Sequence, residues 1–405
     1  MSKIRIKDFG PIKEGYQRRD GWLPISNVTV FIGSQGSGKS TVAKLISTMT
    51  WIEKALVRGD FGIGDLNASE FKRHISYQNI EGYFKDNSLI EYQGRAYHIS
   101  YRSGQLSVIK NMENGYVFPK IMYVPSERNF VSSVRNLSTL KGLPSTLYTF
   151  SDEFIKAIEE LDGQISLPID NSQYEYQELT KLSYIIGDDY KIKLAEASSG
   201  FQSFVPLFIV TSYLANSLNK KSDNATKEIS LEEEKRIRKE IEEILSNRNI
   251  SDDVKRASLE FLSSKFSYSS FINIVEEPEQ NLFPSSQHQL LNSLIRSKNI
   301  NENNKLIITT HSPYIITYLS IAIQAGSLLR KNLPEHLLKK LDAVVPIDTT
   351  LKTEEINIYQ LNEKDGTIQD LQDFEGIPSD HNFLNLSLAE GNVIFDSLLE
   401  IEQEL

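Results

Sequence analysis

Apolar residues along the chain follow two kinds of spacing, and together these predict an α/β protein. Four short segments are almost continuously apolar, which is typical of strands buried on both faces of a sheet: residues 28–32, 120–124, 271–275 and 305–310. A strict alternation of apolar and polar residues, clearest at Tyr97, Ile99 and Tyr101, instead predicts an antiparallel meander. We expect this meander between about residues 77 and 110, beside the first strand of the chain.

Helices are predicted where apolar residues recur every three or four positions. The helix after residues 28–32 is the most regular, with Val42, Leu45 and Ile46 on one face. The other predicted helices cover residues 150–161, 176–186, 204–218, 231–245, 252–265, 285–296 and 386–404. Pro206 is expected in the first turn of its helix, where a missing N–H does little harm.

The same pattern divides the chain into one main domain, which we call the head, and several further segments. The head is expected to be assembled from residues 1–128, 191–218 and 270–325. Residues 129–190 are predicted to form a small helical lobe, and residues 326–405 a C-terminal tail lobe. Residues 219–269 are a predicted insertion of charged helices, either a solvated hairpin with one apolar stripe or an arm on which a partner docks.

Composition narrows the classes of function. The 405 residues carry a formal net charge of −10, which does not favour non-specific binding to nucleic acid. The sequence has no cysteine, which excludes disulfides, cysteine-bound zinc and thiol catalysis. It has no run of about 18 apolar residues and no apolar region near its start, so we expect a cytoplasmic protein without a membrane span or signal peptide.

The segment after residues 28–32 carries the most specific motif, Gly33-Ser34-Gln35-Gly36-Ser37-Gly38-Lys39-Ser40. The spacing G-x-x-x-x-G-K-S lies between a predicted strand and a predicted helix, as a phosphate-binding loop requires. Its glycines let backbone N–H groups turn inward, and the helix start, which includes Thr41, adds a positive end. We therefore expect Lys39 to reach the β- and γ-phosphates of a nucleotide and the Ser40 hydroxyl to bind Mg²⁺.

Polar residues also follow the other predicted core strands. Glu276 and Glu277 end the strand at 271–275, and His311 ends the strand at 305–310. We predict that Glu276 holds Mg²⁺, that Glu277 orients or deprotonates the attacking water, and that His311 contacts the γ-phosphate. Because ligands bind where the strands of an open α/β sheet finish, these groups are expected to converge on one nucleotide or on two faces of an assembly.

A second anion site is predicted at Ser199, Gly200 and Gln202. A small hydroxyl and a glycine at a helix start favour an anion, because unpaired N–H groups and the helix dipole point at it. The first γ-phosphate is already served by Lys39. The second site is therefore expected to face the nucleotide of another copy of the chain, in a head-to-tail dimer or a higher oligomer.

Four motifs resemble one family of ATPases. The motifs occur in the order GSQGSGKS, SSGFQ, FINIVEEPEQNLFP and LIITTHSPYI. The opening segment IRIKDFGPIK also resembles the first strand of these ATPases. The chain is similar in these motifs to the ABC-type ATPases of the SMC, RecF and OLD group, especially the OLD branch. The resemblance implies a P-loop head with a mixed central sheet, an N-terminal antiparallel β lobe and inserted helical segments, using ATP and Mg²⁺.

The resemblance also assigns roles to residues. Ser199, Gly200 and Gln202 would form the signature motif, and His311 the switch histidine. Glu276 stands where many relatives have Asp, and Ser126, Glu127 and Arg128 stand where the Q-loop glutamine is expected. No TOPRIM nuclease segment follows His311, so the chain looks most like stand-alone anti-phage ATPases such as those of PARIS (AriA) and Septu (PtuA).

Three hypotheses of function follow. The first is a regulatory ATPase in which ATP joins two heads and controls a separate effector, such as a TOPRIM or HNH nuclease, after a trigger such as a phage protein. The alternative is a RecF-like ATPase of DNA repair or a DNA clamp, which the charge does not favour. The third, a nucleotide-binding subunit of a membrane transporter, is disfavoured because the motifs resemble the other branch.

Overall fold

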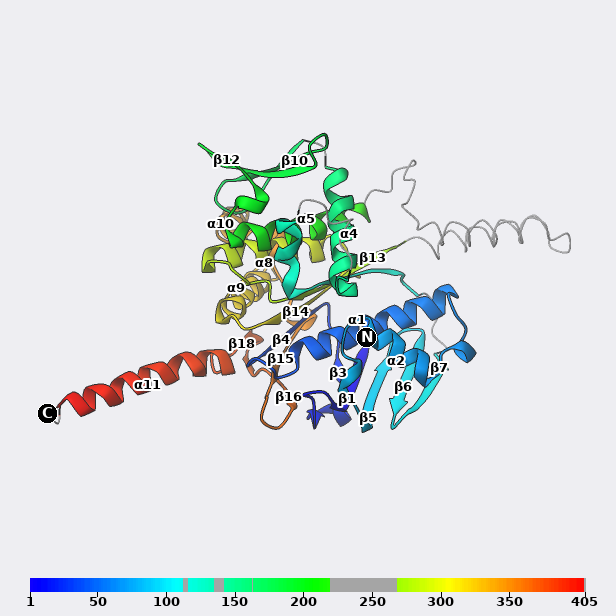
Figure 1. Ribbon diagram of the computed structural model, residues 1–405. Helices are drawn as coiled ribbons and strands as arrows, with labels where there is room; N and C mark the ends of the chain where they lie inside the picture. Colours follow the sequence, from blue (N-terminus) through cyan, green and yellow to red (C-terminus); the bar gives the residue numbers. More distant parts are fainter. Residues whose placement is uncertain (112–115, 135–141, 162, 219–267, 404–405) are drawn as a thin grey trace.

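A mixed sheet of seven strands runs through the middle of the part of the chain that the structure describes (Figure 1). The computed structural model describes residues 1–111, 116–134, 142–161, 163–218 and 268–403. In spatial order, the strands are β2 (Gly15–Tyr16), β16 (Thr367–Asp370), β15 (Ile356–Leu361), β4 (Val28–Gly33), β14 (Lys305–Thr310), β13 (Ser270–Glu276) and β8 (Pro119–Val124). The five strands from β15 to β8 are parallel to one another, so their carboxyl ends lie at one edge.

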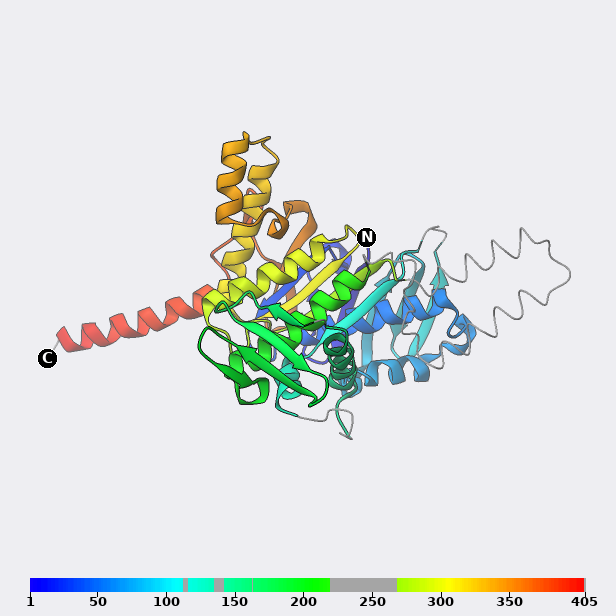
Figure 2. The same ribbon diagram turned by 90° about the horizontal axis from the view of Figure 1, so that it is seen from above.

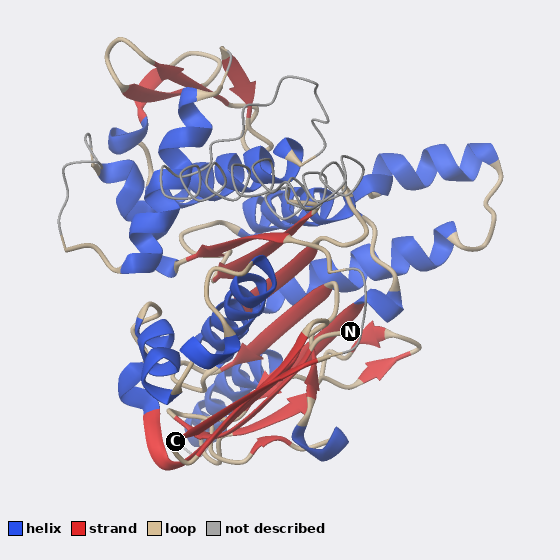
Figure 3. Ribbon diagram, turned by 90° about the vertical axis from the view of Figure 1, so that its right-hand side faces the viewer, coloured by secondary structure: helices blue, strands red, loops and turns tan. Residues whose placement is uncertain are grey.

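Both faces of this sheet are covered, which explains the apolar runs. Val30 and Ile32 of β4 belong to a core shared with helices above the sheet in Figure 1, whereas Phe31 belongs to a core on the opposite face. The upper helices are α4 (Ser145–Glu159), α5 (Ser199–Ser217), α8 (Pro284–Asn299) and α9 (Pro313–Leu329). The lower face carries α1 (Lys39–Arg58), and Figure 3 shows the strands between the helices.

An antiparallel sheet lies below α1, as the alternation of residues predicts. Its order is β3-β1-β5-β6-β7, so β1 has the meander at its side. The bounds are β1 (Lys3–Phe9), β3 (Leu23–Pro24), β5 (Phe84–Gln93), β6 (Tyr97–Arg102) and β7 (Gln105–Lys110), with the short helix α2 (Ala68–Ser76) packed nearby. The predicted α/β class, with a mixed central sheet and an N-terminal antiparallel β lobe, is confirmed.

Residues 129–190 differ from the predicted helical lobe. They contain α3 (Phe130–Ser133) and α4, but then the antiparallel strands β9 (Gln164–Ser166), β10 (Gln173–Gln177) and β11 (Leu182–Ile186), which β12 (Lys191–Lys193) completes. The prediction of a helix over 176–186 is wrong, because Tyr174 and Ile185 are paired across β10 and β11 and both are buried. Cross-strand pairing here overrides the helical spacing.

Two predicted helix starts are also wrong. Helix α4 begins at Ser145 rather than at 150. Helix α5 begins at Ser199 rather than at 204, which places Pro206 in its interior. An interior proline is tolerated at the loss of one backbone hydrogen bond, and Pro206 is buried among apolar residues of α5.

The C-terminal segment is not a separate lobe. β15 pairs in parallel with β4, and β16 continues the same sheet, so both belong to the head. The rest of the segment comprises α10 (Glu335–Val344), the two-residue strands β17 (Asp373–Phe374) and β18 (Ile377–Pro378), and α11 (Phe383–Gln403). Figures 1 and 2 show α11 extending away from the rest of the molecule.

The predicted helical insertion at 219–269 lies almost entirely outside the described residues, which resume at Tyr268. Among the residues that are described, no helix is long and apolar enough to cross a membrane.

Candidate functional site

The loop 33–40 connects β4 to α1 and needs glycine at two of its positions. Gly33 and Gly38 have φ values of 149° and 102°. A Cβ at Gly33 would lie 2.5 Å from the carbonyl oxygen of Leu361, and one at Gly38 would lie 2.5 Å from Cδ1 of Ile12. The neighbouring strand β15 and the turn after β1 therefore hold the loop in its curled form.

Lys39 lies across the curled loop. Its Nζ donates hydrogen bonds to the carbonyl oxygens of Gly33 (3.0 Å) and Ser34 (2.8 Å), and the residue is 5% exposed. Burial lowers the pKa of Lys39 to about 8, although nearby carboxylates, Glu277 first among them, oppose this shift. The lysine is thus a poorly solvated cation that faces acidic residues of the next strands.

The rest of the loop is divided between an exposed tip and a buried base. Ser34, Gln35 and Gly36 are exposed, whereas Ser37 is buried and its Oγ has no hydrogen-bond partner among the described residues. Ser40 is partly exposed and Thr41 is 4% exposed. An unpaired buried hydroxyl is costly, so the base of the loop is suited to a polar ligand.

Glu276 is the last residue of β13 and is 5% exposed. Its carboxylate accepts hydrogen bonds from the Tyr123 hydroxyl and, at 3.4 Å, from the Ser126 N–H. No group of three or more acidic or histidine residues that could hold a metal is found in the described part of the chain. The hydroxyl of Ser40 and the carboxylate of Glu276 are oxygen donors of the type that Mg²⁺ takes as ligands.

Glu277 and His311 form a pair at the ends of β13 and β14. Oε1 of Glu277 lies 3.5 Å from Nε2 of His311, and both side chains are about one-third exposed. The hydrogen bond with His311 lowers the pKa of Glu277, with smaller contributions from the charges of His311 and Lys39. Glu277 has a φ of 43°, and its N–H donates to the Thr309 carbonyl at 2.8 Å, so the backbone fixes the direction of the carboxylate.

Two further acidic residues that the sequence did not single out accept hydrogen bonds from groups of the site. Glu279 accepts the His311 N–H at 2.6 Å, while its other carboxylate oxygen is buried without a partner among the described residues. Burial raises the pKa of Glu279. Glu363, from the turn after β15, accepts the Ser34 hydroxyl at 2.6 Å, so an acidic residue also lies at the tip of the loop.

Arg128 is fully buried and holds the strand end from behind. Its guanidinium donates to the carbonyl oxygens of Glu276 (2.8 Å) and Glu277 (2.7 Å), and its Nε donates to that of Ser203 (3.2 Å). In the segment Ser126–Arg128, where a Q-loop glutamine was expected, the structure thus places an internal support. The sequence Pro-Ser-Glu-Arg directly after a core strand indicates that this segment lies near the site. It does not show in which direction the Arg128 side chain points.

The predicted second anion site lies at the start of α5. Ser199 is exposed and Gly200 is half-buried, with a Cβ position 3.1 Å from the Asn281 carbonyl oxygen. The amide of Gln202 donates instead to the carbonyl oxygens of Ala195 (3.1 Å) and Ala197 (3.0 Å). In the described part of the chain, Ser199, Gly200 and Gln202 form no hydrogen bond or ion pair with the loop 33–40.

Comparisons with known proteins give similarity of structure at low identity. No family model matches the chain, and no curated protein matches it. The SMC head domain from Thermotoga maritima is 10% identical, over 92% of this chain and 98% of that chain, with a TM-score of 0.39.

Two further structures are of the same general kind. An Smc head domain with an extended coiled coil, bound to the C-terminal domain of ScpA derived from Pyrococcus furiosus, is 9% identical over 91% of this chain and 96% of that chain, with a TM-score of 0.39. A dimeric ATP-binding cassette in a post-hydrolysis state with ADP and Pi is 12% identical over 92% and 100%, with a TM-score of 0.29. At this level, the similarity carries no inference about what the chain binds.

Proposed function

We propose that the chain binds MgATP at residues 33–41 and hydrolyses it. The observation that carries the proposal is the arrangement of Lys39, Glu277 and His311. A buried cation on a curled loop faces a carboxylate that a histidine holds at 3.5 Å. Phosphoryl transfer to water requires three groups: a cation that binds the phosphates, an acceptor for the proton of the water, and a group that contacts the γ-phosphate.

Each residue then has one task. Lys39 would leave the carbonyl oxygens of the loop for the β- and γ-phosphates, and the N–H groups of residues 34–38 would bind the phosphate oxygens. Ser40 and Glu276 would hold Mg²⁺, which bridges and neutralises phosphate oxygens. Glu277, kept ionised by His311, would orient the attacking water or accept its proton, and His311 would contact the γ-phosphate.

We also propose that two copies join head to tail around ATP through Ser199 and Gly200. Both residues are at the start of α5 and are accessible, and a helix start attracts anions. Gln202 would position this segment through its bonds to Ala195 and Ala197. By the motif resemblance, the joined state would regulate a separately encoded effector, such as a nuclease, in defence against phage.

The test of hydrolysis compares two substitutions with matched controls. Lys39→Ala and Glu277→Gln should each lower the ATP turnover number by at least about 100-fold, because each removes a group that acts on the transferred phosphate or the water. The exposed residues Lys7 and Glu81 provide the controls Lys7→Ala and Glu81→Gln, which should leave turnover unchanged. Turnover that survives Lys39→Ala in a folded protein would refute the proposed site.

A further inference from the structure

A cavity of about 310 Å³ lies at the opposite edge of the central sheet from the loop 33–40. Its wall includes Lys305 at the start of β14 and Ser270 at the start of β13, whereas the proposed ATP site lies at the ends of these strands. Thr50 and Glu53, from the middle of α1, line another side. At 1.5 Å per residue, Glu53 is roughly 20 Å along the helix from Lys39, so the two sites are separate.

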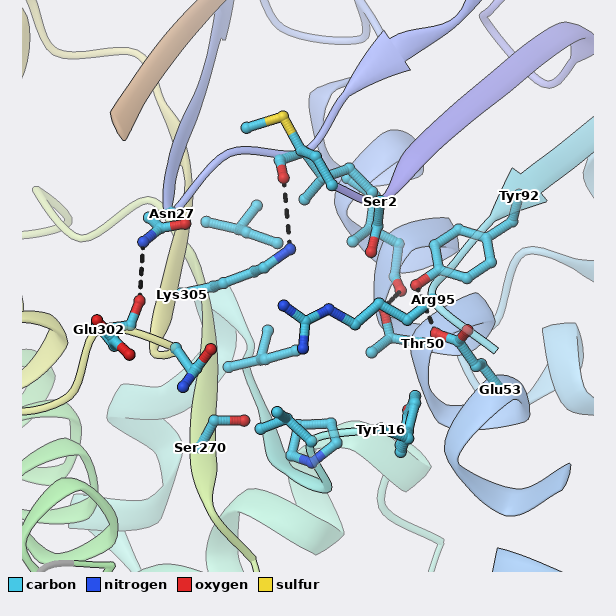
Figure 4. Close-up of a pocket in the computed structure, with 18 residues that line it drawn as sticks. Ser2, Asn27, Thr50, Glu53, Tyr92, Arg95, Tyr116, Ser270, Glu302 and Lys305 are labelled. Carbon is cyan, nitrogen blue, oxygen red and sulfur yellow. Dashed lines mark hydrogen bonds between the residues drawn. The ribbon is translucent and has the colours of Figure 1, made fainter. Parts of the chain in front are cut away.

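Two cations face this cavity. Figure 4 shows the Arg95 side chain reaching across it with its guanidinium turned towards the end of Lys305. Lys305 Nζ donates one long hydrogen bond, 3.4 Å to the carbonyl oxygen of Ile25. The Arg95 guanidinium forms no hydrogen bond or ion pair with any residue that the structure describes, so both cations keep donors available.

The nearby carboxylate of Glu53 does not neutralise the pair. It is 2% exposed and accepts hydrogen bonds from the N–H groups of Ala96 (2.7 Å) and Tyr97 (3.2 Å) and from the Tyr92 hydroxyl (3.1 Å). Burial raises the pKa of Glu53, which disfavours its negative charge. The acceptor sites of this carboxylate are therefore used within the wall.

The pKa of Lys305 shows which neighbouring charge acts on it more strongly. Burial lowers the pKa of Lys305 to about 8, and the repulsion from Arg95 lowers it by more than the attraction of Glu53 raises it. Like charges held close together are unfavourable, and neither Glu53 nor Glu302, the two acidic residues that line the cavity, forms an ion pair with Arg95 or Lys305 in the described part of the chain. An anion placed between the two cations would reduce their repulsion.

We propose that this cavity binds a small molecule through an oxyanion group, a phosphate or a carboxylate, held between Arg95 and Lys305. Arg95 is an exposed residue that also lines the cavity, so a ligand has a path from solvent along its side chain. The volume is at the lower end of the roughly 300–1,000 Å³ of ligand pockets, which suits a small ligand. Isoleucines 46, 272 and 307 and Tyr116 provide apolar wall for the rest of it.

The test must separate this site from the phosphate loop, which would also bind phosphate. Binding of inorganic phosphate, and in a second arm of acetate, is measured by calorimetry without nucleotide in protein carrying Lys39→Ala. One phosphate or one acetate should bind per chain and raise the unfolding temperature, since a ligand that binds only the folded state stabilises it. Binding of phosphate alone would identify a phosphate site, and binding of both a general oxyanion site.

Substitutions then assign the binding to the cavity. Adding Arg95→Gln or Lys305→Met to the Lys39→Ala protein should weaken binding at least about tenfold, because each removes a charge-assisted hydrogen bond. Arg102→Gln is the matched control: Arg102 is an exposed arginine on β6 outside the cavity, so this change should leave affinity unaltered. Lys305→Met also removes a poorly solvated charge, so the variant is expected to fold.

Three outcomes would overturn the proposal. They are no binding of either anion by the Lys39→Ala protein, unchanged binding after both cavity substitutions, and an equal loss with Arg102→Gln, which would indicate a general effect of surface charge. Because nucleotide is absent and Lys39 is already replaced, none of these outcomes bears on the proposed ATP site. Failure of that site would show in the turnover of Lys39→Ala and Glu277→Gln alone.

Discussion

At the scale of single residues, Lys39 combines burial with hydrogen-bond partners that carry only partial charge. Its ammonium group is bonded to the carbonyl oxygens of Gly33 and Ser34, which are part of the loop that it is expected to serve. Carbonyl oxygens carry only partial charge, so they offset the loss of water less well than phosphate oxygens would. This explains why the pKa of Lys39 is lowered to about 8 in the free protein, and why an anionic ligand should raise it.

The first prediction is that ATP binding takes up a proton above neutral pH. At about pH 8.5, Lys39 in the free protein is mostly neutral, and the triphosphate favours its charged form, so more than roughly half a proton should enter on binding. Calorimetry in buffers of different ionisation enthalpy measures this number. At about pH 6.5 the lysine is already charged, so the uptake from Lys39 should nearly vanish.

Two variants make the proton count specific. Lys39→Met should abolish the uptake, whereas Lys305→Met, which removes another lysine whose pKa is lowered to about 8, should leave it unchanged. Uptake that persists in Lys39→Met protein, or a release of protons in the wild type, would mean that Lys39 does not meet the triphosphate.

At the scale of elements, Arg128 joins three pieces of backbone that the sheet alone does not connect. It lies in the short 3₁₀ helix Ser126–Asn129 after β8, and it bonds the end of β13 to Ser203 in the second turn of α5. Asn281 adds a second link, because its Nδ2 donates to the Ser203 Oγ at 3.0 Å. The backbone that aims Glu277 is therefore held against the helix that begins with Ser199.

The second prediction concerns Arg128→Met, which keeps much of the length of the side chain but no donor. It would leave buried carbonyl oxygens unpaired, each worth about 1–3 kcal/mol, so the free energy of unfolding should fall by roughly 3 kcal/mol. Denaturant unfolding measures this change, and Arg102→Met, at an exposed position, is the control. A loss below about 1 kcal/mol would mean that Arg128 does not fix the strand end.

The sequence predicts elements well where neighbours along the chain decide them. The strand, loop and helix from Val28 to Arg58 depend on local spacing and glycine geometry, and the structure has them as expected. β10 and β11 were predicted as helix, since their stability comes from pairing Tyr174 with Ile185, which a local pattern does not contain. For the same reason, the contacts of Arg128 with residues about 75 and 150 positions away could not be foreseen.

At the scale of the whole molecule, the central sheet is assembled from strands that are far apart in the sequence. β4 lies between β14 and β15, which are hundreds of residues further on, and Glu363 after β15 touches the loop tip at Ser34. The predicted tail lobe failed because strand order is set by such long-range pairing. The start of α5, by contrast, is exposed at Ser199, and the role proposed for it requires a second copy of the chain.

The last prediction tests that use with Ser199→Glu. A carboxylate at the first helical position is favourable to α5 by about 0.3–1 kcal/mol, because it faces the positive end of the helix dipole. The same charge would repel a triphosphate brought by another copy.

The measurement is light scattering on protein that also carries Glu277→Gln, which slows hydrolysis. It should show an ATP-dependent dimer, and Ser199→Glu should abolish this dimer while the unfolding temperature stays equal or rises. Ser69→Glu, in the first turn of α2, is matched in chemistry and should leave the dimer intact. A dimer that persists with Ser199→Glu would show that the chains meet through some other surface, and the head-to-tail arrangement would have to be given up while the ATP site itself could stand.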